Sequence, residues 1–580
     1  MSFCTQCGSK LDVGSAFCSN CGAKLVDEPQ SRPPTGKADL TLNPSSKSND
    51  EHQWDSFFAT GTDSLKVSKL ARSYSREKKH CIVLTNLQKF RNALGDKYLD
   101  FEIALRTYCM GRIADGWRFH LLDLSSNRLG SSQGDSWEEC VDQLRHGVDR
   151  LQREGRAKVD AVFIVGDEEI VPMALFDNPL YDEFFGSNPD ADVDSDLPYS
   201  TLSIKDPFVD SVALDIKVTV GRLPTGLLDG GQIAANYFQQ ANDLKTFSSS
   251  FSQGFGVTAE VWQSASQEVA SMVGDINLFN SPDVTIAEFP TVFDERSNYY
   301  YFNVHGSDMD KHWFGEGTIE GCIPVVSPEH FRKPSLPNVL ATEACYGARF
   351  IGHSQEESCL CNALLGKTLA FSGSSRIAYG PAFAPVGLAD IIALDFLSIT
   401  KRGDCFGDAL SLARHSLLDS DSLTPLDLLT VVEFNLFGDP TLTLPAAQST
   451  LSSQGNSYAK SSTGGVGKSA LSPRNPLSSV RASLQRSSSN LNIRMPDVLG
   501  NVKASLDATW EKINARMVEH IFNAEPSLKG VEPQVKLMKL GLGRKEAMQV
   551  SVLKKQNNIF IGRTVYTDRS GKILSELCPR

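Results

Sequence analysis

Two stretches, YYYFNVHG at residues 299–306 and VLATEACYG at residues 339–347, decide how this chain is expected to fold. Each begins with an apolar run that predicts a buried strand. The first run leads to His305, which is followed by Gly306, and the second leads to Cys345. If the two strands are neighbours in a parallel sheet, both side chains leave at its carboxyl edge, where open α/β sheets bind ligands. The sequence therefore predicts an imidazole and a thiol in one cleft.

This pair of side chains has a specific chemical meaning. An ionised cysteine is a strong nucleophile, and a neighbouring histidine supplies the proton transfers that acyl transfer needs. Gly306 would let a substrate backbone approach closely. The alternative is that His305 is a hydrogen-bonded residue at a strand end and Cys345 a small buried filler, as most free cysteines are.

Length and composition place the chain among globular proteins of several domains. It has 580 residues, of which 41% are hydrophobic, enough for a large core. A net charge of -12 argues against broad, charge-driven binding to nucleic acid or membranes. We find no apolar stretch typical of a signal peptide or a transmembrane helix, so we expect a cytoplasmic protein.

Four of the 13 cysteines form a metal-type cluster near the start of the chain. Cys4 and Cys7 belong to one Cys-x-x-Cys-Gly motif, and Cys18 and Cys21 belong to a second. Four thiolates complete the tetrahedral shell of a structural zinc ion and leave no open position for substrate. So short a segment cannot form a core of its own, so zinc would drive its folding. The alternatives are a redox pair or disulfides.

Composition divides the rest of the chain. Residues 26–75 and 447–494 are rich in Ser with little hydrophobic periodicity, which predicts flexible linkers. From residue 76 to 446, strand-like and helix-like segments alternate, as in a parallel sheet covered by helices. The segments are strands at 81–84, 117–124 and 161–165, a strand followed by a loop at 369–376, and helices at 92–108, 136–153, 386–400, 407–418 and 425–437. Residues 495–580 predict a small α+β module with one helix and two strands.

Several short motifs in the region 80–445 carry a family resemblance. Besides the His-Gly and Ala-Cys stretches they are VGD at 165–167 with IVP at 170–172, SDLPY at 195–199, VGRLP at 220–224 and LFGDP at 436–440. This ordered set resembles the caspase-like (clan CD) cysteine peptidases, and most closely the gingipain family. The resemblance implies a caspase-like α/β/α peptidase domain with a parallel sheet. Unlike the secreted gingipains, this chain lacks a recognisable signal peptide, so their digestive role is not carried over.

The resemblance also implies roles for individual residues. Cys345 would attack the scissile carbonyl, His305 would assist its ionisation and protonate the leaving amine, and the backbone N–H groups of Gly306 and Cys345 would hold the oxyanion. A carboxylate often orients such an imidazole, and Glu169 is our candidate, with Glu168 nearly as good. The alternative for both is a surface charge. By resemblance, Asp196 would line a pocket for a basic P1 side chain, an assignment that the nearby Arg349 complicates.

An acidic run lies just before the SDLPY motif, with Asp190, Asp192, Asp194 and Asp196 at alternate positions. A solvated loop is the simplest interpretation. Calcium is a second hypothesis, because hard cations bind several carboxylate oxygens, although the spacing is not that of an EF-hand. The basic P1 pocket at Asp196 is the third.

Together these observations predict a regulated cysteine endopeptidase that cleaves protein substrates. The zinc ribbon or the C-terminal module would bind a regulatory protein partner, and nucleic acid or membrane partners are not expected. The competing hypothesis is a zinc-ribbon sensing or scaffold protein whose peptidase-like domain is inactive or only conditionally active.

Overall fold

The computed structural model describes most of the chain from residue 79 onward, and residues 53–580 form one unit. The described ranges are 55–56, 79–125, 135–153, 158–181, 190–227, 230–244, 253–317, 321–353, 355–381, 385–419, 423–444, 508–540, 545–556 and 559–579. The predicted zinc cysteines, the linker 447–494 and, apart from residues 55–56, the linker 26–75 lie outside these ranges.

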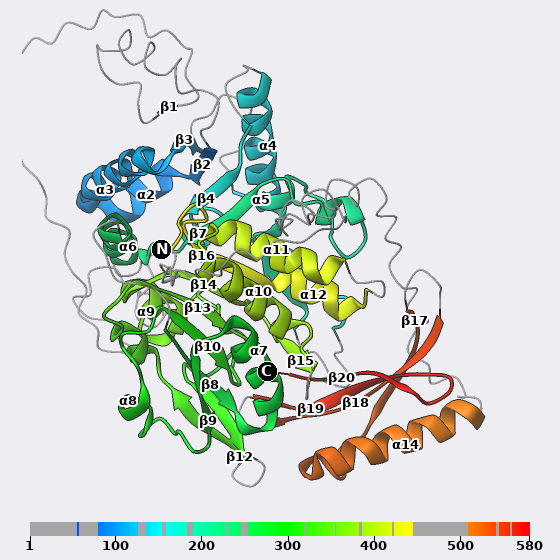
Figure 1. The fold of residues 1–580 in the computed structure, drawn as a ribbon. Coiled ribbons are helices and arrows are strands. Elements are labelled where there is room, and N and C mark those ends of the chain that lie inside the picture. Colours follow the sequence, from blue (N-terminus) through cyan, green and yellow to red (C-terminus); the bar gives the residue numbers. More distant parts are fainter. Residues whose placement is uncertain are drawn as a thin grey trace, which may run out of the picture. The chain divides into compact units, whose positions relative to one another are not determined.

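An eleven-stranded sheet forms the centre of the fold (Figure 1). Its strands, in the order in which they pair, are β1 (Asp55–Ser56), β3 (Trp117–Asp123), β2 (Lys79–Thr85), β4 (Ala161–Val165), β7 (Thr219–Leu223), β16 (Phe434–Gly438), β14 (Thr368–Ser374), β13 (Asn338–Thr342), β10 (Tyr299–Asn303), β8 (Gly254–Ala259) and β9 (Ile276–Ser281). All neighbouring pairs are parallel except β1 with β3 and β14 with β16. The predicted α/β class with a mostly parallel sheet is confirmed.

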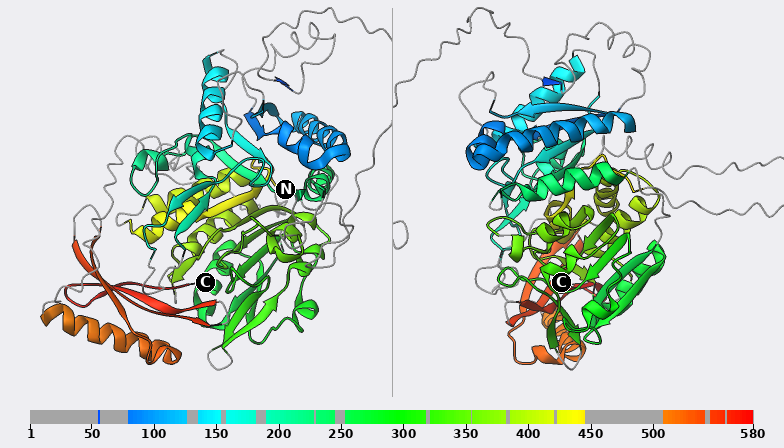
Figure 2. Two further views of the ribbon diagram at one scale, coloured as in Figure 1. Left: turned by 180° about the vertical axis from the view of Figure 1, so that it is seen from behind. Right: turned by 90° about the vertical axis from the view of Figure 1, so that its left-hand side faces the viewer.

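Helices cover both faces of this sheet (Figure 2). Every residue of β4, β10, β13, β14 and β16 is buried, and since successive side chains point to opposite faces, neither face is open to water. The helices are α2 (Leu87–Leu94), α3 (Tyr98–Gly111), α4 (Trp137–Arg153), α5 (Leu197–Thr201), α6 (Gln232–Asp243), α7 (Gln263–Val273), α8 (Phe289–Val292), α9 (Cys359–Leu365), α10 (Ala389–Lys401), α11 (Phe406–Leu418) and α12 (Pro425–Glu433). Helices α7, α10 and α11 pack side by side, as do α3, α6 and α9.

The antiparallel pairing of β14 with β16 divides the sheet into two halves of opposite direction. Strands β2, β4, β7 and β16 run one way, and β14, β13, β10 and β8 run the other. The carboxyl ends of the two halves therefore lie at opposite edges of the sheet. This polarity decides which side chains can meet at the candidate site.

Within the second half, β10 and β13 are neighbours and parallel, as the sequence predicts. Phe302 lies opposite Thr342, and the Glu343 N–H donates to the Phe302 carbonyl oxygen at 2.9 Å. Three residues farther along each strand, this register leads to His305 and Cys345. The two predicted reactive residues thus leave the sheet at the same carboxyl edge.

One predicted helix is too long. We expected a helix over 425–437, but α12 ends at Glu433 and the chain continues directly as β16. The helix begins with a capping box in which Thr424 and Asp427 bond reciprocally, and Pro425 occupies its first turn. Its end is set by tertiary context, because the apolar FNLF run fills the gap between β7 and β14.

The C-terminal region contains one long helix and more strands than predicted. Helix α14 (Ala508–Ala524) packs against the sheet strands β17 (Gln534–Leu540), β18 (Lys545–Gln556), β19 (Ile559–Asp568) and β20 (Ile573–Pro579) (Figure 1). The sequence predicts only β18 and β19. The sheet also has a fifth strand, β15 (Tyr379–Pro381), which comes from the peptidase-like region and pairs with β20. The module is therefore joined to that region by strand pairing.

Two short antiparallel pairs complete the described structure. Strand β5 (Ala174–Asp177) pairs with β6 (Asp192–Ser195), and β11 (Trp313–Gly317) pairs with β12 (Gly321–Val326). None of the helices in the described part of the chain combines the length and the apolar character that crossing a bilayer requires.

Candidate active site

Cys345 lies in a tight turn just beyond β13. The next residue, Tyr346, has a left-handed φ of 53°, a conformation that costs a non-glycine residue energy and is held in place by hydrogen bonds. Its N–H donates to the Arg376 carbonyl at 2.8 Å, and its hydroxyl donates to Asp190 at 2.7 Å. The Cys345 thiol faces the Ala378 carbonyl oxygen at 3.7 Å and is only 3% exposed.

Gly306 brings the histidine segment against the cysteine. A Cβ atom at this position would lie 1.7 Å from the Cys345 carbonyl oxygen and 3.1 Å from its nitrogen. No side chain fits into that space, so glycine is required by the close approach of two backbones. The backbones of Gly306 and Cys345 are thus in close contact.

The backbone and ring of His305 are held by strand β11. Its N–H donates to the Phe314 carbonyl at 2.8 Å, and the Phe314 N–H donates back at 2.9 Å. Glu316 follows two residues later on the same face of β11, and its Oε2 lies 2.9 Å from His305 Nε2. The Trp262 ring packs edge-on against the imidazole, with 4.4 Å between the ring centroids. The other ring nitrogen, Nδ1, has no hydrogen-bond partner among the described residues.

A second thiol lies beside this histidine. Cys322 on β12 pairs directly opposite Glu316 on β11, so the hairpin places thiol and carboxylate together next to the ring. Burial lowers the pKa of His305, but the neighbouring Cys322 sulfur and Glu316 carboxylate outweigh this effect and raise the pKa to about 10. The ring therefore carries a proton at neutral pH.

The carboxylate in contact with the His305 ring is Glu316, whereas the predicted candidate Glu169 lies elsewhere. Glu169 is exposed and follows β4, whose carboxyl end lies at the opposite edge of the sheet from that of β10. Glu168 is also engaged elsewhere, because its Oε2 accepts the Met173 N–H at 2.7 Å. Burial raises the pKa of Glu168.

Sequence reasoning missed Glu316 because its role depends on a long-range turn of the chain. The one local signal is its position between Gly315 and Gly317 in a short apolar segment. A Cβ atom at residue 315 would lie 1.9 Å from the Ser281 hydroxyl, so the strand is packed too tightly for a side chain there. A lone carboxylate in a closely packed strand is a recognisable sign of a specific partner.

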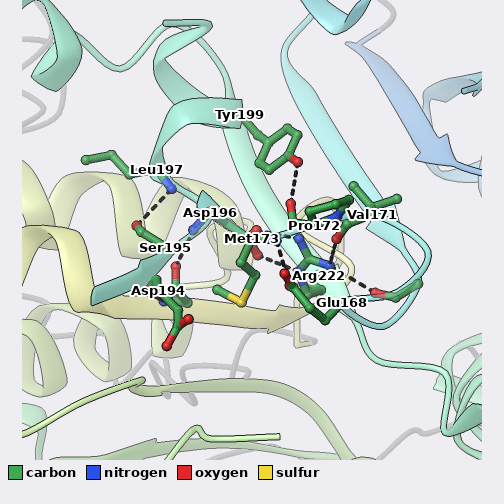
Figure 3. Close-up of polar contacts among 12 residues, drawn as sticks. Glu168, Val171, Pro172, Met173, Asp194, Ser195, Asp196, Leu197, Tyr199 and Arg222 are labelled. Carbon is green, nitrogen blue, oxygen red and sulfur yellow. Dashed lines mark hydrogen bonds and ion pairs between the residues drawn. The ribbon is translucent and has the colours of Figure 1, made fainter. Parts of the chain in front are cut away.

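Asp196 is buried in an ion pair within the chain (Figure 3). The Arg222 side chain is fully buried and donates from Nε and Nη2 to the two Asp196 oxygens at 2.8 and 2.6 Å. Arg222 Nη1 also donates to the carbonyls of Gly166 at 3.1 Å and Val171 at 2.7 Å. The bidentate contact that we predicted for a substrate arginine is thus made by Arg222. Both Asp196 carboxylate oxygens are therefore engaged within the chain.

The acidic run before Asp196 forms strand β6 from Asp192 onward, and two of its carboxylates, Asp190 and Asp194, have specific partners. Asp190 accepts from the Tyr346 hydroxyl and from the Ile377 N–H at 3.1 Å, and Asp194 pairs with Arg376 at 2.8 Å. Burial raises the pKa of both Asp190 and Asp194. The run therefore lies next to the segment around Cys345. Among the described residues, its carboxylates do not converge on a common point as calcium ligands would.

The N-terminal motif has a known counterpart. Residues 3–25 match the zinc-ribbon domain family. The four predicted zinc ligands lie within this zinc ribbon, which is outside the residues that the structure describes. The match supports zinc binding by this segment.

The larger region is similar to solved peptidase structures at low identity. It is similar to a complex of the pro- and mature domains of RgpB from Porphyromonas gingivalis, with 13% identity and a TM-score of 0.44 over 64% of this chain and 80% of that one. It is also similar to the Arg-specific cysteine proteinase gingipain R, with 14% identity and a TM-score of 0.42 over 64% and 79%. A third structure, a protease, has 10% identity and a TM-score of 0.41 over 87% and 91%.

Sequence comparison adds no relative for this region, since no curated protein matches the chain. Membership of the gingipain family or of the wider caspase-like group stays a prediction. The chemistry must therefore be argued from the geometry of the site itself.

Proposed function

We propose that this chain is a cysteine endopeptidase that cleaves protein substrates through Cys345 and His305. The observation that carries the proposal is the contact of the Gly306 and Cys345 backbones at the carboxyl edge of the paired strands β10 and β13, which supports a dyad of His305 and Cys345. The buried Glu316 then orients the imidazole from β11. Nucleophile, proton carrier and orienting carboxylate are the three parts that acyl transfer by a thiol requires.

The reaction follows from the charges of these groups. The protonated His305 ring favours the thiolate form of Cys345, which attacks the scissile carbonyl and forms a C–S bond. The backbone N–H groups of Gly306 and Cys345 would stabilise the oxyanion. The C–N bond breaks as His305 gives its proton to the leaving amine, and water then attacks the thioester and transfers a proton back through the ring. Throughout, Glu316 would hold the ring in place.

This proposal does not include the expected preference for a basic P1 side chain. Because Arg222 occupies both oxygens of Asp196, that residue does not supply a preference for a basic P1 side chain. Substrates are therefore proposed by class only, as extended segments of proteins.

Variants at the two reactive residues test the peptidase assignment. We expect Cys345→Ala and His305→Ala to abolish the appearance of new N-termini in a protein mixture, whereas Cys361→Ala, which removes a buried thiol in α9, retains it. Each loss should exceed about a hundredfold, since each group acts in the bond-breaking steps. Equal cleavage by wild type and Cys345→Ala under activating conditions would refute the assignment.

The structure also suggests how the enzyme is regulated. Strand β20 pairs antiparallel with β15, with Pro579 opposite Tyr379, Cys578 opposite Gly380 and Leu577 opposite Pro381. Strand β15 begins one residue after Ala378, whose carbonyl faces the Cys345 thiol. An extended peptide that reaches Cys345 would add to an exposed strand edge of this kind.

The same strand also lies near His305. Cys578 packs with Ala259 and with Trp262, the residue whose ring covers the His305 imidazole. Its thiol donates to the Gly380 carbonyl at 3.7 Å. With β20 in place, His305 is 1% exposed and Cys345 is 3% exposed. We infer that β20 holds the peptidase in a latent state and that its displacement opens the site.

Latency is tested by weakening β20 and measuring access to the thiol. Leu577→Asp places a charge at a position that is 4% exposed, and Lys572→Asp makes a comparable change at an exposed position just before the strand. We expect iodoacetamide to modify Cys345 faster in Leu577→Asp than in wild type or the control. Cys405, a partly exposed thiol, serves as the internal reference for alkylation.

Two outcomes would contradict latency. One is an unchanged ratio of Cys345 to Cys405 labelling in folded Leu577→Asp protein. The other is full hydrolytic activity in wild type without any displacement of β20. A second variant, Cys578→Glu, repeats the test if Leu577→Asp does not fold.

Of the competing scaffold hypothesis, we retain the possibility that the peptidase-like domain is only conditionally active. A capped site makes the domain conditionally active, and a partner that binds the zinc ribbon or the C-terminal module would be the natural release factor. The ribbon itself would bind one structural zinc ion through Cys4, Cys7, Cys18 and Cys21.

A further inference from the structure

Three potential metal ligands meet beside the candidate site. The ligand atoms of His305, Glu316 and Cys322 all lie within 4.8 Å of one another, and within the described residues no other group of three such side chains does so. His305 Nε2 and Glu316 Oε2 are already 2.9 Å apart. His305 is 1% exposed and Glu316 8% exposed, whereas Cys322 is partly exposed.

The fold fixes this arrangement. His305 is bridged to Phe314 by two backbone hydrogen bonds, Glu316 lies on the same face of β11 as Phe314, and Cys322 pairs opposite Glu316 on β12. Each ligand therefore has its position set by strand pairing, and a site on paired strands needs little rearrangement to receive an ion.

The chemistry of the three ligands selects zinc. In tetrahedral zinc sites the Zn–N and Zn–O distances are about 2.0–2.2 Å and Zn–S about 2.3 Å, so ligand atoms lie about 3.3–3.7 Å apart. The observed separations need to change by less than about 1.5 Å. A thiolate and an imidazole favour zinc over magnesium or calcium. One thiolate, one carboxylate and a neutral imidazole also balance the two positive charges of the ion, which suits a mostly buried site.

The site has an apolar cover. Cys322 packs against a cluster of Phe314, Ile559 and Ile561, of which the last two belong to β19 in the C-terminal module. An apolar shell of this kind limits the access of water and strengthens the electrostatic attraction between an ion and its ligands.

We propose that His305, Glu316 and Cys322 form an inhibitory zinc site that removes His305 from the peptidase reaction. The inhibitory role rests on the proposed function, whereas zinc binding does not. A zinc ion at His305 Nε2 displaces the proton that this nitrogen shares with Glu316, so the ring loses its contact with Glu316 and can no longer carry the two protons of its charged form. Three protein ligands leave a fourth position, which a water molecule can fill.

Zinc stoichiometry of the full-length chain gives the direct test. Native mass spectrometry after titration with zinc should show two bound ions per wild-type chain, one in the ribbon and one at this site. Cys322→Ala should bind one ion under the same conditions. Cys405→Ala is the matched control, because it removes another partly exposed thiol and should still bind two.

The activity measurement addresses the inhibitory role separately. The zinc concentration that halves peptidase activity, measured relative to the zinc-free rate of each variant, should rise at least about tenfold in Cys322→Ala and stay unchanged in Cys405→Ala. One bound zinc in wild type would overturn the site even if the peptidase is active. Two bound ions in a chain without peptidase activity would support the site and refute the proposed function instead. Two bound ions with no effect on an active peptidase would overturn the inhibitory role.

Discussion

Replacing Asp196 with alanine should destabilise the whole protein and leave substrate preference unchanged. The change removes the counter-charge of Arg222, whose side chain is fully buried and makes two hydrogen bonds to Asp196 at 2.8 and 2.6 Å. Two unit charges about 4 Å apart attract by about 4 kcal/mol at an effective dielectric constant of about 20. Measured losses on breaking buried ion pairs are of the same size, about 3–5 kcal/mol.

A double variant separates the ion pair from the space that it fills. Asp196→Leu with Arg222→Met replaces both charges by apolar groups, so no uncompensated charge stays buried. It still leaves the Gly166 and Val171 carbonyls without the donors that Arg222 supplies, at a cost of about 1–3 kcal/mol each. We therefore expect the double variant to lose less stability than the sum of the two single variants.

Urea unfolding and steady-state kinetics provide the assay. At a slope of about 3 kcal/mol per molar urea, the Asp196→Ala midpoint should fall by about 1 M or more. Any loss of activity should be equal for substrates with arginine and with leucine at P1, because Asp196 does not face the substrate in this arrangement. A loss confined to arginine substrates, with the urea midpoint unchanged, would show that the ion pair is not the role of Asp196.

Three further predictions follow from individual contacts. Gly306→Ala should abolish activity and lower the thermal unfolding temperature, because its Cβ would lie 1.7 Å from the Cys345 carbonyl oxygen. Gly111→Ala, at the end of α3, is the control. Its nearest atom is an Asn242 side-chain oxygen at 3.0 Å, so this variant should change the unfolding temperature only mildly. Burial and Lys333 lower the pKa of His330 to about 4, whereas a histidine in the unfolded chain has a pKa of about 6.5. The unfolded chain therefore binds the proton first, and the stability of the folded state falls as the pH drops from about 6.5 to about 4. His330→Gln should reduce that loss of stability, which is measured as the difference between the urea midpoints at about pH 7.5 and about pH 5. An equal difference in wild type and variant would contradict this prediction. Replacing Cys4 and Cys7 with serine should remove one zinc ion per chain, measured by elemental analysis, and an unchanged zinc content would exclude them as ligands.

The sequence predicts the half of the site that depends on local pattern. Strands β10 and β13 are buried apolar runs, and their parallel pairing brings His305 and Cys345 to one edge without any further information. The orienting carboxylate is different, because Glu316 reaches His305 only through the bridge to Phe314. No spacing in the sequence reports that bridge.

The error at Glu169 has a topological origin. Glu169 follows strand β4 and His305 follows strand β10, and a single parallel sheet would place the carboxyl ends of both strands at one edge. The antiparallel pairing of β16 with β14 reverses one half of the sheet, and β16 is the last strand of the sheet along the chain. The hydrophobic run of β16 also continues the pattern of the predicted helix. The local sequence therefore predicts neither that this segment is a strand nor which strands it pairs with.

Several motifs that carry the family resemblance turn out to bind one another. Asp167 accepts the Thr225 N–H at 2.6 Å and the Leu227 N–H at 2.9 Å, which joins the VGD motif to the residues just after VGRLP. Asp196 of SDLPY binds Arg222 of VGRLP. In this chain these motif residues hold the scaffold together, so a residue matched by motif need not contact substrate.

The pairing of β15 with β20 has a consequence for the order in which the site and its cap are synthesised. Cys578 bonds to a residue 198 positions earlier in the chain, so the capping strand is synthesised long after the strands that bear His305 and Cys345. At about 5–20 residues per second, translation of the 198 residues from Gly380 in β15 to Cys578 in β20 takes about 10–40 s. During that interval the site has no cap of its own. A peptidase that is silent when complete would thus be open while it is being made, and nascent chains on the same message would be its first accessible substrates.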